Sequence, residues 1–312
     1  MDKLPHNKNL RLLFLGDIVG EPGRKAVAAF IPKLREERSI DFIVVNGENS
    51  AGGRGITPKI AIGLLRAGAT VITTGDHIWD QREIVDFLPT EPRLLRPLNY
   101  PDKTPGNGSV VLESDKGPVA VMNAQGRTFM NPPLENPLIA IDEELEKIKN
   151  EYDIKMVFLD FHAEATSEKI ATARYLDGRV SAVVGTHTHV QTADEQILPK
   201  GTAFLCDAGM CGPKESILGR RVEPILHRMK TSMPQTMPVA KGPVEIRGVL
   251  VDIDTTTGKA VDIERIAEIE TNKLVKISEP LLPINFPKKP EIKEAKSGKN
   301  IIKYSIYSIL AF

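Results

Sequence analysis

Side chains that could coordinate metal ions follow five short apolar runs of the sequence. Two histidines, His187 and His189, come directly after the apolar run 182–184. Because alternate residues of a strand point the same way, both rings could face one site. The other candidates share this placement after an apolar run of strand length: Asp17, Asn46, Glu48, Asn49, Asp76, His77 and His162. Such oxygen and nitrogen donors, without a thiolate among them, suit Fe, Mn or Zn.

These candidates can meet in space only if the runs form a parallel sheet. Ligands of parallel α/β sheets bind beyond the carboxyl ends of the strands, where residues distant in sequence converge. The donors outnumber the ligands of one tetrahedral ion and suffice for two ions about 3.5–4 Å apart, the geometry used in phosphoester hydrolysis. The alternative is that each is an independent cap, turn former or core residue on a fold with another purpose.

The pattern of apolar runs and turn residues predicts such a sheet. A strand at 11–16, a helix at 24–38, a strand at 41–46, a helix begun by Thr57 and Pro58, and a strand at 70–75 give a βαβ alternation. Pro32 predicts a kink or a second start in the first helix. Further elements are expected in this order: strand 117–125, helix 141–150, strand 155–161, helix 167–176, strands 179–185 and 203–207, and an antiparallel pair around the turn 255–259.

Composition excludes several classes of protein. The 312 residues carry 41 basic and 41 acidic side chains, so a net charge of zero argues against a general nucleic-acid or membrane-surface binder. No apolar run reaches the roughly 18 residues needed to span a membrane. The polar start of the chain lacks the apolar centre of a signal peptide, which indicates a cytoplasmic protein. Cys206 and Cys211 are expected to be reduced thiols.

Seven motifs resemble those of one family. They are GDIVGEPGRKAV, VVNGENSAGGRGIT, TTGDHIWD, LRPLNYP, DFHAEATSEK, GTHTHVQTADEQILPKGTAF and DAGM. From about residue 11 to about residue 268, the chain is similar to the YmdB-like branch of the metallophosphoesterases. The resemblance implies an α/β fold, a four-layer α/β/β/α sandwich of the metallophosphoesterase type. We expect one such domain at 11–285, a polar leader at 1–10, and a linker with a C-terminal tail at 286–312.

The resemblance also implies which residues act. One ion would be held by Asp17, Glu48, Asn49 and His189, and a second by Glu48 as a bridge with Asp76, His162 and His187. His77 would be the catalytic histidine. Iron or manganese are the expected metals, with zinc as an alternative. The implied activity is phosphodiesterase activity on small phosphoesters, including 2′,3′-cyclic nucleotides and cAMP, in a bacterial, cytosolic homo-oligomer without a membrane or a stable nucleic-acid partner.

One position departs from the family's motif. The family has Gly-Asn-His where this chain has Gly75, Asp76 and His77. Aspartate still offers an oxygen ligand, but it adds a negative charge and removes an amide donor. We therefore expect metal to be bound at least as tightly as in the family and a substrate anion to be held less well.

The mechanism expected from these residues is a two-metal hydrolysis. Two cations lower the pKa of a bridging water, the resulting hydroxide attacks phosphorus in line, and His77 protonates the leaving sugar oxygen. Asp80 could orient His77, although a surface or capping role is favoured. Arg127 could grip phosphate or pair with a local acid. Gly52, Gly53 and Gly55 could admit substrate or form a tight turn.

Three alternatives to a phosphodiesterase remain open. A phosphomonoesterase would use the same metals. A metal-binding regulatory protein with weak activity would fit the departure at Asp76. A nucleotide-cofactor oxidoreductase is suggested by GDIVGEPG, but its spacing of Gly16, Gly20 and Gly23 does not match the dinucleotide-binding pattern.

Overall fold

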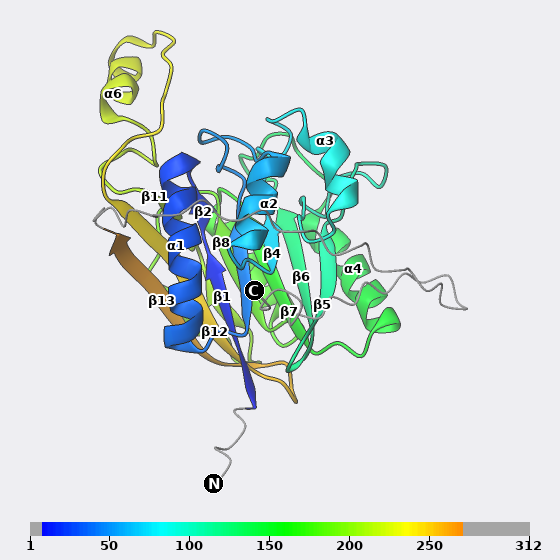
Figure 1. Cartoon of the computed structure of the whole chain (residues 1–312). Helices are drawn as coiled ribbons and strands as arrows, with labels where there is room; N and C mark the ends of the chain where they lie inside the picture. Colours follow the sequence, from blue (N-terminus) through cyan, green and yellow to red (C-terminus); the bar gives the residue numbers. More distant parts are fainter. Residues whose placement is uncertain (1–7, 271–312) are drawn as a thin grey trace.

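Two β-sheets lie face to face between two layers of helices (Figure 1). The computed structural model describes residues 8–270. Helices α1 (Gly20–Arg38) and α2 (Pro58–Arg66) cover one sheet, and α4 (Pro137–Glu151) and α5 (Thr166–Leu176) cover the other. The implied four-layer α/β/β/α sandwich is confirmed.

The first sheet has the order β2-β11-β12-β1-β3-β4, with β13 paired to β12. Its strands are β1 (Asn9–Leu15), β2 (Asp17–Ile18), β3 (Phe42–Asn46), β4 (Val71–Thr73), β11 (Met210–Pro213), β12 (Val244–Asp254) and β13 (Ala260–Glu270). Strands β1, β3 and β4 are parallel, as the βαβ alternation predicts. The expected antiparallel pair is β12 and β13.

The second sheet has the order β5-β6-β7-β8-β10-β9. Its strands are β5 (Ser109–Ser114), β6 (Gly117–Gln125), β7 (Met156–His162), β8 (Ala182–Thr186), β9 (Gln196–Ile197) and β10 (Ala203–Leu205). The central strands β6, β7, β8 and β10 are parallel, and β5 and β9 pair antiparallel at the two edges. The carboxyl ends of β7 and β8 therefore point the same way.

Three apolar cores separate the four layers. Phe14 of β1 packs against Phe158 of β7 between the sheets, with ring centroids 5.0 Å apart. Ile31 of α1 belongs to the core on the outer face of the first sheet, and Leu145 of α4 to the core on the outer face of the second. The central parallel strands of both sheets are therefore buried on both faces, which explains their near-continuous apolar runs.

Side-chain caps begin two of the helices, α2 and α4. The Thr57 hydroxyl accepts a hydrogen bond from the backbone N–H of Ile60 at 3.3 Å, with Pro58 in the first turn of α2. Helix α1 runs without interruption through Pro32, so the second start predicted there is wrong. Two short helical elements, α3 (Ile84–Phe87) and the 3₁₀ helix η1 (Leu88–Thr90), and the strands β2, β5, β9 and β11 have no counterpart in the sequence-based prediction. Helix α6 spans Val222–Thr231, around His227, where the sequence has a helical pattern. Helix α6 stands away from the sandwich and buries none of its residues (Figure 1).

Both cysteines lie in the interior as free thiols. Burial raises the pKa of Cys211 to about 12, so this thiol stays protonated and unreactive at neutral pH. Within residues 8–270, none of the helices combines the length and the apolar character that a membrane crossing requires. Most of the polar leader and the whole linker and tail fall in 1–7 and 271–312, outside the described residues.

Candidate metal centre

The carboxyl ends of five strands, three from the first sheet and two from the second, meet at one place. Strands β1, β3 and β4 deliver Asp17, Glu48 and Asp76, and β7 and β8 deliver the histidines. Two groups form there, one of Glu48, Asp76, His162 and His187, the other of Asp17, Glu48 and His189. Within each group the ligand atoms lie within 4.8 Å of one another. Glu48 belongs to both groups, so one carboxylate lies between two possible cation positions.

In the first group, two imidazole nitrogens face two carboxylates. His162 Nε2 lies 3.2 Å from Glu48 Oε1 and 3.0 Å from Asp76 Oδ1. His187 Nδ1 lies 3.0 Å from His162 Nε2 and 3.4 Å from Asp76 Oδ1. At this distance two unprotonated ring nitrogens would repel each other through their lone pairs. Either one of them carries a proton or both bind the same cation. The donor set fits a metal ion with nitrogen and oxygen ligands.

In the second group, a buried carboxylate oxygen lacks a partner. Asp17 is fully buried, and its Oδ1 has no hydrogen-bond partner among the described residues. The same oxygen lies 3.9 Å from His189 Nε2, while Oδ2 accepts from the backbone N–H of His187 at 3.2 Å. An unpaired buried acceptor is costly, and a cation bound beside it would remove that cost.

Asn49 lies between the second group and the shared carboxylate. Its Nδ2 is 2.9 Å from Glu48 Oε1 and 3.1 Å from His189 Nε2. Rotation of the carboxamide would bring Oδ1 to the same place, which is the orientation that a metal ligand requires.

The buried carboxylates of the site need a neighbouring positive charge. Burial raises the pKa of Asp17. Burial would also raise the pKa values of Glu48 and Asp76, but His162 outweighs it and both are lowered. Burial would lower the pKa of His162, yet the Glu48 and Asp76 carboxylates raise it well above its usual value. A proton on His162 thus supplies the charge that the carboxylates need, and a bound metal cation would supply it instead.

His77 lies beside the two groups and belongs to neither. Its backbone N–H donates to Glu48 Oε2 at 3.4 Å. Its Nδ1 lies 3.3 Å from Asp80 Oδ2, and that carboxylate also pairs with Arg54 Nε at 2.8 Å. The orienting role of Asp80, which the sequence analysis ranked below a surface role, therefore has a direct contact in the structure.

The two histidines of the THTH motif converge for a different reason from the predicted one. Strand β8 ends at Thr186, so the alternation of side chains along a strand does not set the direction of these two histidines. His187 and His189 have φ values of 100° and 66°, in the left-handed region, and they serve different groups. Such conformations cost about 1–3 kcal/mol each for residues other than glycine, so surrounding contacts must hold this turn.

Asp160 is a buried carboxylate below the site, and it is not among the side chains predicted from the sequence. It accepts hydrogen bonds from Thr73 Oγ1 at 2.5 Å, Asn46 Nδ2 at 2.9 Å and Thr186 Oγ1 at 2.7 Å, and burial raises its pKa to about 6. Thr186 Oγ1 is also 2.9 Å from His162 Nδ1. These linked hydrogen bonds favour a proton on Nδ1 of His162, so that Nε2 is free to bind a metal ion in the cluster. The sequence contained a signal for this residue, because an aspartate inside the apolar run VFLDF indicates a buried and hydrogen-bonded carboxylate.

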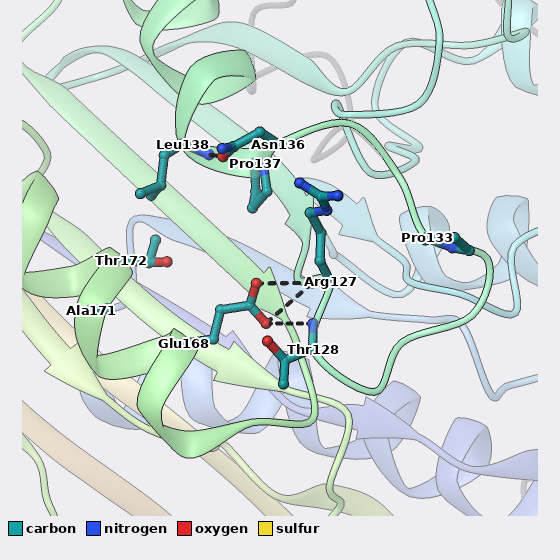
Figure 2. A pocket seen from close by; sticks show the side chains of 9 residues that line it. All are labelled: Arg127, Thr128, Pro133, Asn136, Pro137, Leu138, Glu168, Ala171 and Thr172. Atoms are coloured by element: carbon teal, nitrogen blue, oxygen red, sulfur yellow. Dashed lines mark hydrogen bonds between the residues drawn. The ribbon is translucent and has the colours of Figure 1, made fainter.

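Asn46 and Arg127 lie outside both ligand groups. The side chain of Asn46 bonds to Asp160 and to the backbone N–H of Glu48, so it shapes the loop instead of facing the cluster. Arg127 lines a pocket between α4 and α5 that contains no member of either group. Figure 2 shows the Glu168 carboxylate bonded to the backbone N–H groups of Arg127 and Thr128, with the Arg127 side chain directed along the pocket.

The glycines after Glu48 form a tight turn. Gly52 and Gly53 have φ values of 63° and 92°, and their carbonyl oxygens accept hydrogen bonds from Arg220 at 3.0 and 2.5 Å. A Cβ on Gly53 would lie 2.4 Å from the Arg220 Cζ. Of the two interpretations, the structure favours the turn, which fastens this loop to the segment before α6.

Comparisons with known proteins identify relatives of this chain that match it over most of its length. A model of the YmdB-like protein family matches residues 13–266. A 2′,3′-cyclic-nucleotide 2′-phosphodiesterase of Bacillus subtilis is 50% identical over 257 residues, covering 82% of this chain and 96% of that protein. A solved hypothetical protein of Thermus thermophilus is 40% identical with a TM-score of 0.78, over 84% of this chain and 100% of that one. A solved phosphatase of Mycoplasma pneumoniae is 33% identical with a TM-score of 0.79, over 85% and 95%.

Removing the Asp160 carboxylate should destabilise the fold. Asp160→Ala leaves the donors of Thr73, Thr186 and Asn46 without their acceptor, and each unpaired buried donor costs about 1–3 kcal/mol. We expect urea denaturation to show a loss of at least ~3 kcal/mol in the free energy of unfolding. Asp153→Ala, at an exposed position before β7, is the control and should change stability by less than about 0.5 kcal/mol. A loss below ~1 kcal/mol for Asp160→Ala would contradict its role as a shared acceptor.

Proposed function

This chain belongs to the YmdB-like family, and from that membership we propose that it is a dinuclear-metal phosphodiesterase acting on small cyclic nucleotides. The single observation that carries the proposal is the position of Glu48, a buried carboxylate common to two groups of metal-ligand side chains. The name of the Bacillus subtilis relative supports 2′,3′-cyclic nucleotides as the substrate class.

The proposed ligands divide between two ions. The first ion is held by Asp17, Glu48, Asn49 and His189, and the second by Glu48, Asp76, His162 and His187. This division is supported by the distances within the two groups. Iron or manganese suit the donors, with zinc as the alternative. Two bound cations would supply Lewis acidity toward the phosphoryl oxygens and a nucleophilic water at neutral pH.

His77 is proposed as the proton donor to the leaving oxygen. Its Nδ1 is engaged by Asp80, which leaves Nε2 as the nitrogen that exchanges a proton with substrate. Its side chain is 26% exposed, so solvent can return the proton between turnovers. Asp76, where the family has asparagine, adds negative charge near the substrate phosphate and so weakens the hold on the anion relative to an amide.

Two further properties belong to the same proposal. Family resemblance supports a cytoplasmic location and a homo-oligomer. A phosphomonoesterase is the second candidate, because the similar Mycoplasma pneumoniae structure is that of a phosphatase.

Elemental analysis and a substrate comparison test the function. We expect the purified chain to hold about two transition-metal ions and to hydrolyse 2′,3′-cyclic AMP and bis(p-nitrophenyl) phosphate with a higher kcat/KM than p-nitrophenyl phosphate. A preference for the monoester would favour the phosphatase. Two bound metals without hydrolysis of any of the three would favour the regulatory protein instead.

Glu48→Gln should reduce metal binding at both positions, because the amide removes the shared negative charge while keeping the shape of the side chain. We expect the metal content to fall from about two ions to below one per chain, measured by elemental analysis after dialysis. Glu21→Gln removes an exposed carboxylate on α1 and is the matched control, with metal content unchanged. An unaltered content in Glu48→Gln would remove this residue from the proposed centre.

His77→Asn should separate catalysis from metal binding. Loss of one acid–base group lowers kcat by about 10²–10⁴-fold. Metal content should stay at the wild-type level, because His77 is in neither ligand group. The comparison is His227→Asn, which changes an exposed histidine of α6. Wild-type kcat in His77→Asn would show that another group donates the proton.

A further inference from the structure

An almost completely buried ion pair lies behind the THTH turn. Lys169 of α5 and Asp207, which follows β10, are each 1% exposed, and Lys169 Nζ lies 2.7 Å from Asp207 Oδ2. Neither residue belongs to the two ligand groups. A buried ion pair is often no more stabilising than an apolar pair of the same size, so stability alone does not account for it.

The chain makes room for this pair at β8. A Cβ added to Gly185 would lie 2.9 Å from Cδ of Lys169 and 1.9 Å from the carbonyl oxygen of Cys206. The lysine stem therefore crosses β8 at its one residue without a side chain, and from there the ammonium group reaches Asp207. The glycine lies two positions before His187, at the start of the turn.

Asp207 holds the residue between the two histidines by both its backbone and its side chain. Oδ2 accepts from the backbone N–H of Thr188 at 3.1 Å and from its Oγ1 at 2.7 Å. Oδ1 accepts from the backbone N–H of Gly209 at 2.8 Å, and the carbonyl oxygen of Gly209 accepts from the N–H of Asp17 at 3.0 Å. One carboxylate thus holds Thr188, which lies between His187 and His189, and Gly209, whose carbonyl oxygen holds the backbone of Asp17.

We propose that the Lys169–Asp207 ion pair positions the THTH turn, through Thr188, so that His187 and His189 reach two different metal ions. The left-handed backbone of both histidines is unfavourable without such a contact. The ammonium group of Lys169 lies against the Asp207 carboxylate, which accepts four hydrogen bonds in all, one from Lys169, two from Thr188 and one from Gly209. This inference rests on the proposed dinuclear centre and assigns two positioning residues and Thr188 to it.

Thr188→Val tests the contact with little change in shape. The substitution removes the hydroxyl bond to Asp207 Oδ2 and keeps the backbone bond. Loss of an outer partner of metal ligands costs about 10–100-fold in metal affinity. We expect the Kd for Mn²⁺, measured by calorimetric titration of chelator-treated full-length protein, to rise by about this factor at both positions. Thr188→Ser retains the hydroxyl and should restore the wild-type Kd.

A core variant separates positioning from general destabilisation. Leu145→Ala opens a cavity in the apolar core that α4 forms with the second sheet, so it should lower the unfolding temperature and leave the Kd for Mn²⁺ within about twofold of the wild-type value. Thr188→Val should instead raise the Kd for Mn²⁺ and leave the unfolding temperature close to the wild-type value. If Thr188→Val binds Mn²⁺ like the wild type, or if Leu145→Ala weakens binding as much, the positioning role is wrong. If the wild type itself binds no Mn²⁺, the proposed centre fails and this inference fails with it.

Lys169→Met tests whether the positive charge of Lys169 is needed to hold the THTH turn. The methionine retains an unbranched stem of similar length but removes the ammonium group that donates to Asp207 Oδ2, so the buried carboxylate loses its cationic partner and holds Thr188 less firmly. We expect a rise of at least about 10-fold in the Kd for Mn²⁺. Wild-type affinity in a folded Lys169→Met protein would show that the ion pair serves stability only.

Discussion

The requirement that buried negative charge be compensated governs the whole site. Asp17 and Glu48 have almost no exposed surface, and Asp76 is only 14% exposed, yet imidazoles are the groups that face them within the two clusters. A carboxylate in such surroundings is stable only beside a proton, a cationic side chain or a metal ion. The unpaired oxygen of Asp17 and the facing nitrogens of His162 and His187 leave places that divalent cations would fill.

The sandwich architecture makes this concentration of charge possible. Because apolar cores bury both faces of the central strands, the side chains that could bind metal gather beyond the carboxyl ends of these strands. The first sheet contributes the carboxylates and the second the imidazoles, so the centre forms where the two sheets meet. Asp160 ties the sheets together there, since it belongs to β7 and accepts hydrogen bonds from Asn46 and Thr73 of the first sheet. The fold and the site therefore share the same polar contacts.

The contacts that hold the ligands are as specific as the ligands themselves. Thr186 fixes the ring of His162 from behind, and Thr188 fixes the turn that presents His187 and His189. Both threonines are held by buried aspartates, Asp160 and Asp207. This pattern explains why polar residues interrupt otherwise apolar segments, and why the long motifs around them contain more than metal ligands.

The sequence by itself determined the central strands of both sheets, most of the longer helices, the four layers through family resemblance, and the set of side chains that meet at the strand ends. Apolar runs of strand length and caps such as Thr57 are local signals, so they can be read without coordinates. Only the tertiary structure decided which side chains face the cluster and which support it. Asn46 was a candidate ligand, but its side chain bonds to Asp160 below the site. The THTH histidines converge through a left-handed backbone conformation and not through the alternation of side chains along a strand. Partners such as Lys169 and Asp207 are distant in sequence, and their pairing depends on packing between layers, which no local pattern encodes.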